Sequence, residues 1–219
     1  MIRLANMLLI GAAGRDSGKT TLACHVIADL AETHRPIGLK VTVIRQEEQG
    51  CPRGNRHCSV CGSLEGKFSL TEETDGSGSK DTHRMVAAGA DRVYWLRVRS
   101  DEVPAAMEHL LSVIPADRPI VCESNTLRLH VAPGLFLQVY REGDGARKES
   151  ARRVQRYVDR FVSFDGIGFD PSPEVIRFSE RRFRIALEAT AVILSGGASS
   201  RMGEDKALLE IDGTPFLLA

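Results

Sequence analysis

Three absences narrow what this sequence can encode. The 219 residues hold 29 Lys and Arg against 29 Asp and Glu, so there is no excess positive charge of the kind that binds the backbone of a nucleic acid. No apolar stretch of about 18 residues is present, so we expect no transmembrane helix and no membrane partner. The five cysteines are odd in number and argue against a disulfide framework.

The N-terminal residues superficially resemble a short signal peptide. Asn6 interrupts their apolar pattern, and the apolar run at 7–10 leads directly into a glycine-bearing loop. We therefore interpret these residues as a buried first strand and expect a cytoplasmic protein.

The loop at 11–20 lies between this apolar run and a helical pattern. Leu22, Val26 and Leu30 recur on one helical stripe directly after it. Strand, loop and helix in this order are the context that the phosphate-binding pattern G-x-x-x-x-G-K-[ST] requires. Ala13 stands where the pattern has its first glycine, which is tolerable if this residue keeps a negative φ. The alternative is a glycine-rich turn that happens to precede a helix.

A phosphate-binding loop works through backbone N–H groups and the positive end of the helix dipole. The Lys19 ammonium can reach the β- and γ-phosphates of a nucleotide, and the Thr20 hydroxyl can ligate Mg²⁺. We predict Lys19 as a catalytic residue as well. No Asn-Lys-x-Asp motif for reading guanine is visible, so the residues alone leave GTP and ATP open. The predicted nucleotide-binding residues of the loop are Gly14, Asp16, Ser17, Gly18, Lys19, Thr20 and Thr21.

Three polar residues elsewhere are candidates for the same site. Lys40 lies within an apolar run at 37–44 that is typical of a strand, either on its solvated face or close to a bound phosphate. Glu123 closes a short apolar strand, where a carboxylate can hold magnesium or its water and act as a catalytic residue; an ordinary strand-end acid is the alternative. Asp75 lies in a polar segment, either solvated or as a further magnesium ligand.

Residues 45–80 are polar and too many for a plain connection within a domain. The C-x-x-C at 58–61 places two thiolates where one turn can offer both to a metal, and we predict a site for zinc or a related thiophilic ion. Free thiols and a redox pair are the alternatives. If this loop were the working site, the protein would be a nucleotide-gated metal-binding or metallochaperone-type P-loop protein. The predicted zinc ligands are Cys51, His57, Cys58 and Cys61.

Strands alternate with helices along the chain, which predicts a three-layer α/β sandwich with a mostly parallel sheet and a ligand at the carboxyl ends of the strands. We expect Asp81 to cap a helix that follows it. We also expect an arginine-rich helix that ends near Phe161. The predicted domains are 1–185, which binds the nucleotide, and 186–219, which begins a second α/β domain.

A second strand-and-loop pattern begins at Ala191, without a Gly-Lys-Thr. Residues 191–217 carry a leucine, a small residue, Gly-Gly, Ser-x-Arg-Met-Gly, Asp-Lys and Gly-x-Pro in order, and so resemble the start of the molybdenum cofactor guanylyltransferases, the MobA-type enzymes. The resemblance implies attack of a molybdopterin phosphate on the α-phosphate of GTP. Only 13 residues follow Lys206, so we expect an incomplete transferase segment. The resemblance implies that Leu194, Gly196, Gly197 and Arg201 contact the nucleotide and that Lys206 contacts its phosphates.

Residues 6–140 resemble the partner in that pathway, the MobB-type GTP-binding accessory proteins. The resemblance implies a P-loop α/β protein that dimerises, binds GTP with Mg²⁺ and hydrolyses it weakly, with molybdopterin or a molybdenum cofactor enzyme as an indirect partner. This chain departs from the family at Ala13, at Glu123-Ser124 and in the cysteine-bearing insertion. The matching residues are Gly18-Lys19-Thr20-Thr21, Leu39-Lys40, Asp75, Lys80-Asp81-Thr82 and Ala88-Gly89-Ala90.

Overall fold

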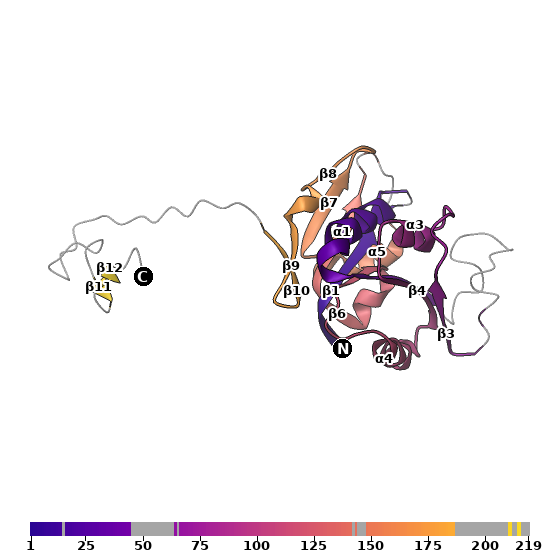
Figure 1. Cartoon of the computed structure of the whole chain (residues 1–219). Helices are drawn as coiled ribbons and strands as arrows, with labels where there is room; N and C mark the ends of the chain where they lie inside the picture. The colour runs from indigo at the N-terminus through magenta and orange to yellow at the C-terminus, as the bar shows by residue number, and fades with distance from the viewer. Residues whose placement is uncertain are drawn as a thin grey trace. The chain divides into compact units, whose positions relative to one another are not determined.

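Apolar runs along the first part of the chain pair into one eight-stranded sheet of order β3-β4-β2-β5-β1-β6-β7-β8 (Figure 1). Neighbouring strands are parallel except at the two edges, where β3 with β4 and β7 with β8 are antiparallel. The predicted α/β fold with a mostly parallel sheet is therefore confirmed. The strands are β1 (Ile2–Ala12), β2 (Ile37–Ile44), β3 (Phe68–Glu73), β4 (Arg92–Arg99), β5 (Ile120–Glu123), β6 (Val131–Tyr140), β7 (Arg160–Phe164) and β8 (Phe169–Asp170).

This computed structural model describes residues 1–14, 16–44, 64, 66–141, 143, 148–186, 210–211 and 214–215. The chain divides into two units, Met1–Ala186 and Leu187–Ala219. In the second unit the described residues form a two-stranded antiparallel pairing of β11 (Glu210–Ile211) with β12 (Thr214–Pro215).

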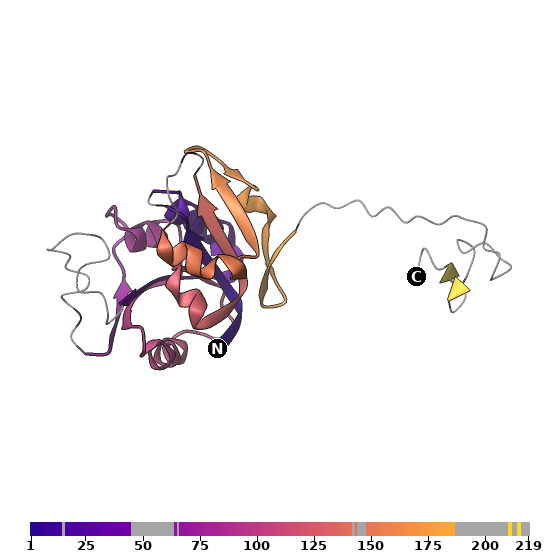
Figure 2. The same cartoon turned by 180° about the vertical axis from the view of Figure 1, so that it is seen from behind.

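Helices cover both faces of the sheet in the first unit, as the front and back views show (Figures 1 and 2). One face carries α1 (Lys19–His34) and α3 (Asp81–Ala87), and the other carries α4 (Val103–Val113) and α5 (Glu149–Val154). Side chains alternate along a strand, so Leu8 and Leu9 of β1 enter different cores. Both faces of β1 are thus buried from Met7 onward, which explains the continuous apolar run at 7–10.

Three short 3₁₀ helices and one hairpin complete the first unit. The hairpin of β9 (Ile176–Ser179) and β10 (Arg182–Ile185) packs its buried Phe183 into the core beneath α1. The 3₁₀ helices are η1 (Thr126–Leu129), η2 (Gln155–Tyr157) and η3 (Pro173–Val175).

Two predicted elements are wrong. The arginine-rich helix ends at Val154 rather than near Phe161, because residues 160–164 pair with β6 as the parallel strand β7. Phe161 continued the helical spacing, but the run of aromatic and β-branched residues around it suits a strand, and pairing with β6 decides the outcome. Part of the predicted 45–80 loop is likewise a strand, β3, whose Phe68 and Leu70 pack against the core on the α4 side.

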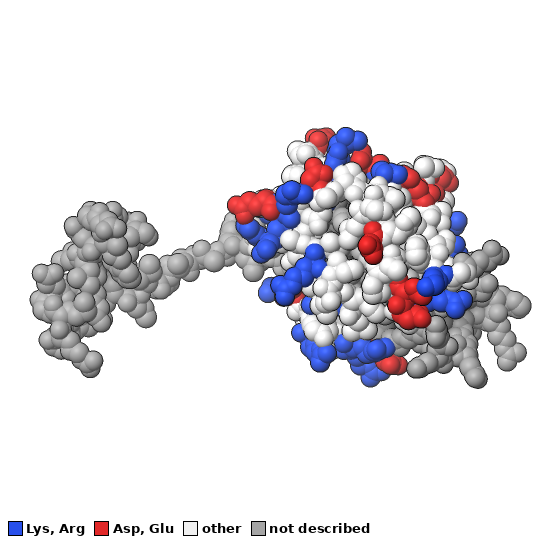
Figure 3. Space-filling view, turned by 90° about the horizontal axis from the view of Figure 1, so that it is seen from below, with Lys and Arg blue, Asp and Glu red and all other residues white. Residues whose placement is uncertain are grey.

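The distribution of surface charge and the length of the helices can be described for part of the chain. On the face shown in Figure 3, acidic and basic side chains are interspersed around uncharged ones. Among the described helices, none combines the length and the apolar character needed to cross a bilayer.

Candidate functional site

The loop that follows β1 is anchored on both sides. The backbone N–H of Ala13 donates to the carbonyl of Val139 (2.8 Å), and Lys148 donates from its backbone N–H to Ala13 (2.9 Å) and from Nζ to the carbonyl of Gly14 (2.6 Å). On the other side, the Asn125 side chain accepts from the N–H of Ala12 (2.8 Å) and donates to its carbonyl (3.0 Å). The loop is therefore held at the carboxyl edge of the sheet.

Glycine is required where the loop enters α1. Gly18 has φ +82° and lies just before Lys19, the first residue of the helix. That φ belongs to the left-handed region, which glycine adopts at no steric cost. The described non-glycine residues with positive φ are Asp16, Arg35, Glu180 and Arg181, so Ala13 keeps the negative φ that its place in the pattern demands.

A buried carboxylate faces the loop lysine. The neighbouring strands β1 and β5 bring Lys19 Nζ within 3.4 Å of Glu123 Oε2, and the Glu123 side chain is fully buried. Neither oxygen of Glu123 has a hydrogen-bond partner among the described residues. A buried carboxylate in this state is costly, which favours a site where a cation or water completes its surroundings.

A second carboxylate, Asp81, joins the loop threonine to Lys40. Thr20 Oγ1 donates to Asp81 Oδ1 (3.0 Å), and Lys40 Nζ forms an ion pair with Asp81 Oδ2. Burial opposes ionisation of Asp81, but the Lys40 ammonium and the Thr20 hydroxyl outweigh it and hold the pKa of Asp81 below its ordinary value. Lys40 thus faces this cluster rather than solvent, and only 20% of its side chain is exposed.

Asp81 was not predicted as a site residue, and its predicted role as a helix cap is wrong. Asp81 is the first residue of α3, the N-cap is Lys80, and no side chain caps the helix. The carboxylate instead points to Thr20 and Lys40, because α3 packs against α1 and β2. Nothing in the local pattern distinguishes such an acid from a capping one; the one signal was Lys40, a lysine within a strand.

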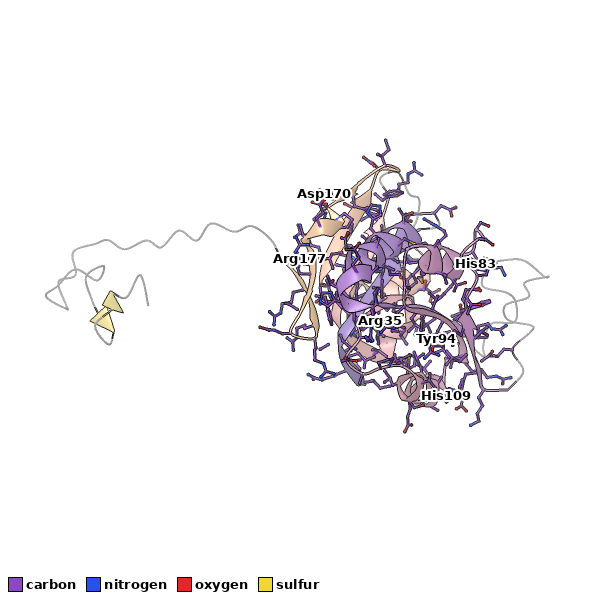
Figure 4. All side chains as sticks on the ribbon, viewed as in Figure 1. Arg35, His83, Tyr94, His109, Asp170 and Arg177 are labelled. Carbon is purple, nitrogen blue, oxygen red and sulfur yellow. The ribbon has the colours of Figure 1, made fainter. Side chains whose placement is uncertain are left out.

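Asp75, the predicted third magnesium ligand, lies in a different group of side chains. Its Oδ1 accepts from the N–H (2.8 Å) and Oγ (2.6 Å) of Ser77, and its Oδ2 lies 3.5 Å from Nδ1 of His83. The other ring nitrogen of His83, which Figure 4 labels on α3, lies 3.0 Å from Glu73. Asp75 therefore orders the segment before α3, whereas Asp81 contacts the loop.

The next turn of α3 also reaches α1. Arg84 Nη2 donates to Oγ1 of Thr21 (3.1 Å), the last residue of the Gly-Lys-Thr-Thr run. One turn further along α1, burial raises the pKa of the Cys24 thiol, and the nearby Arg84 guanidinium only partly offsets this. Cys24 is therefore a protonated thiol at neutral pH.

Oxygen ligands and ammonium groups are the donors that a magnesium-bound phosphate needs, and both occur here. The oxygens come from Thr20, Asp81 and Glu123, and the ammonium groups from Lys19 and Lys40. Among the described residues no three His, Cys, Asp or Glu side chains are grouped to hold a metal by themselves. A magnesium ion here would thus take part of its coordination from phosphate and water.

Ser17, a further predicted nucleotide-binding residue of the loop, is buried. Two other sets of predicted site residues lie outside the part of the chain that the structure describes. The predicted zinc ligands in this group are Cys51, His57, Cys58 and Cys61, and the predicted nucleotide contacts are Leu194, Gly196, Gly197, Arg201 and Lys206. The metallochaperone alternative depends on the first set, so it stays a prediction.

Comparison with known proteins gives matches to guanylyltransferases over a short region. Residues 191–219 match the MobA-like NTP transferase domain. Over 28 residues the chain is 61% identical to the probable molybdenum cofactor guanylyltransferases of Trichormus variabilis and of Nostoc sp., which covers 13% of this chain and 14% of each relative. The chain therefore spans about 14% of the length of these relatives. No solved structure matches the chain.

These matches confirm the predicted resemblance of the C-terminal residues to the MobA-type enzymes. They connect the chain to proteins named for molybdenum cofactor synthesis, at a short region only. The resemblance of residues 6–140 to the MobB-type proteins is not part of these matches and stays a prediction.

Proposed function

We propose that this chain is a GTP-binding accessory protein of molybdenum cofactor biosynthesis. Residues 1–185 would form its P-loop nucleotide-binding domain, and residues 186–219 would be the start of a nucleotidyltransferase domain. One observation carries the first part: the loop after β1 brings Lys19 and Thr20 against Glu123 and Asp81, from two other elements, at the carboxyl edge of a parallel sheet. Ligands of open α/β sheets bind at this edge.

The phosphates of the nucleotide would lie over the start of α1. This helix has 16 residues and no acidic side chain in its first turn. No carboxylate of that turn therefore offsets the positive end of the helix dipole. Lys19 would exchange its ion pair with Glu123, and Lys40 its ion pair with Asp81, for ion pairs with phosphate oxygens. One ligand would thus neutralise both ammonium groups. Thr21 and the backbone around Gly18 complete the cradle.

Magnesium fits the same group of residues. Thr20, Asp81 and a water held by Glu123 are the oxygen donors that would hold it beside the phosphates. Bound Mg²⁺ would neutralise charge on the β- and γ-phosphates. Glu123 would orient a water for hydrolysis, and Lys19 would stabilise charge on the departing phosphate. We propose that GTP hydrolysis is weak, since these residues would act only by positioning the water and the phosphates and by stabilising charge.

The match at residues 191–219 supports the pathway. An accessory domain joined to a guanylyltransferase segment holds two nucleotide-handling modules at high effective concentration. We further propose that the accessory domain acts as a homodimer in the cytoplasm and meets molybdopterin through a molybdenum cofactor enzyme.

Calorimetric titration of the full chain with GTP, with and without Mg²⁺, tests the proposal. Lys19→Ala should lower GTP affinity by at least about 100-fold, because an ammonium that contacts two phosphates contributes two charge-assisted hydrogen bonds. The matched control is Lys67→Ala, which removes a lysine paired with Glu102 (2.8 Å) at the outer edge of the sheet. Equal affinity in Lys19→Ala and Lys67→Ala would refute a phosphate-binding role for the loop.

A further inference from the structure

The side of the loop opposite to Lys40 and Glu123 is bordered by the turn between β7 and β8. Phe164 is the last residue of β7, and a β-carbon at Gly18 would lie 2.5 Å from its Cδ1. The Phe164 ring thus packs directly on the loop. It stacks on Phe169 (ring centroids 4.6 Å apart, planes 26° apart), and Phe169 meets His25 of α1 edge-on (6.0 Å). The turn is therefore fixed to both the loop and the helix.

Asp165 follows Phe164 in this turn and has a fixed side chain. Its Oδ1 accepts the backbone N–H groups of Ile167 (2.7 Å) and Gly168 (2.8 Å). These N–H donors, Gly168 first and then Ile167, hold the pKa of Asp165 below its ordinary value, so the exposed carboxylate is ionised at neutral pH. The turn thus follows an aromatic ring that packs on the loop with an ionised carboxylate in the next residue.

The geometry of the sheet says which part of a nucleotide would reach this turn. In the order β2-β5-β1-β6-β7, Lys40 and Glu123 lie on one side of β1 and Phe164 on the other. Figure 4 shows the same division: His83 of α3 and Asp170 of β8 lie on opposite sides of α1. With the phosphates drawn toward Lys40, the nucleoside extends toward β7. Lys148, which holds the Gly14 carbonyl, lies on that side as well.

We propose that the turn at 164–168 reads the nucleobase, with Phe164 covering it and the Asp165 carboxylate accepting two N–H groups from a guanine. This rests on the proposed function and deepens it by assigning the base. Guanine presents its N1–H and its exocyclic amine side by side, and a carboxylate accepts both. Adenine presents a lone pair at N1, which the same carboxylate repels. Such a turn selects GTP over ATP without an Asn-Lys-x-Asp motif.

The test changes the hydrogen-bonding pattern of the Asp165 side chain while keeping its shape. Asp165→Asn keeps Oδ1, which accepts the N–H groups of Ile167 and Gly168 and would also accept N1–H of the base. It replaces only Oδ2, the oxygen that would accept the exocyclic amine, with an amide donor. Xanthine carries an oxygen where guanine carries its exocyclic amine, so it complements the asparagine. In the full chain, Asp165→Asn should lower GTP affinity by about 10–100-fold and raise the affinity for xanthosine triphosphate by a similar factor.

The control is Asp117→Asn, which changes an exposed aspartate beside Arg118. Asp117 lies just before β5, at the end of the sheet where the parallel strands begin, so the substitution should leave both affinities unchanged. A misfolded variant loses GTP without gaining xanthosine triphosphate, so the gain is the decisive readout. If Asp165→Asn leaves the GTP affinity unchanged, or if a variant that unfolds at the same denaturant concentration as the parent loses GTP affinity with no gain, base reading by Asp165 is overturned. If the parent binds GTP and ATP equally, base reading fails while phosphate binding stands. If the parent binds no nucleotide, both proposals fail.

Discussion

The loop after β1 separates two neighbourhoods of different chemistry. Toward β5 and β2, charges are paired in or near the protein interior, Lys19 with Glu123 and Lys40 with Asp81. Toward β7 and β8, the contacts are aromatic, and Phe164 lies flat against its neighbour. Paired charges can exchange partners with phosphate and magnesium, whereas an aromatic surface suits a base. In the proposed function, one loop would serve both ends of a nucleotide because its two neighbourhoods differ.

Gly18 contacts the aromatic neighbourhood, which consists of Phe164 and Phe169. Of the substitutions considered, Gly18→Ala should have the largest effect on stability because it disrupts this contact. The change places a β-carbon at φ +82° against Phe164 and should lower the free energy of unfolding by about 2–4 kcal/mol. The matched control is Gly143→Ala, at φ +83° with no described atom within 4 Å of the added β-carbon, which should cost about 1 kcal/mol.

Denaturant unfolding measures both changes. In the Phe164→Ala background, Gly18→Ala should lower the free energy of unfolding by at least about 1 kcal/mol less than it does in the parent, because the overlap with the ring disappears. Equal losses for Gly18→Ala and Gly143→Ala would mean that backbone conformation alone requires the glycine and that Phe164 does not press on the loop.

Glu123→Gln tests the charged neighbourhood, which consists of the pairs Lys19–Glu123 and Lys40–Asp81. The substitution removes a buried charge whose oxygens have no hydrogen-bond partner among the described residues, and its ion-pair partner Lys19 keeps 30% of its side chain exposed to solvent. No buried charge is left uncompensated, so the free energy of unfolding should stay equal or rise by up to about 1 kcal/mol. Hydrolysis of GTP, measured as phosphate release, should fall by about 100-fold, since the water loses its carboxylate. Stability and activity should thus change in opposite directions.

The surface pair Lys67–Glu102 provides the control for this change. Glu102→Gln should alter unfolding by less than about 0.5 kcal/mol and leave hydrolysis unchanged, because exposed ion pairs contribute little. A large loss of stability in Glu123→Gln would show instead that the Lys19–Glu123 pair is structural.

The sequence predicts one neighbourhood better than the other, for a physical reason. Glu123 ends a short apolar strand, and Lys19 follows another, so local patterns place both at the carboxyl edge of a parallel sheet. Phe164 has no such local signal. The spacing of Val158 and Phe161 suits a helix, and only pairing of β7 with β6 turns this segment into a strand that ends beside Gly18.

Asp81 shows the same limit within the charged neighbourhood. An acid at the start of a helical pattern suggests a cap, and this local interpretation is self-consistent. The contact with Thr20 joins residues 61 positions apart and arises only when α3 packs across α1 and β2. Contacts of this range depend on the assembled fold, which no pattern in a short window encodes.

Asp81 also gives the smallest expected effect, on the pH dependence of stability without nucleotide. Because the folded protein holds the pKa of Asp81 below the ordinary value near 3.9, the unfolded chain binds more protons in this range, and stability rises with pH. The contribution is therefore present above about pH 4 and is lost as the pH falls through the folded value. Solvent screens this partly exposed pair, so the contribution should stay below about 1 kcal/mol. Denaturant unfolding of the parent and Asp81→Asn at pH 7 and pH 3 measures it: the variant should lose less stability on acidification, and parallel losses would mean that Asp81 is not held by Lys40 and Thr20 in solution.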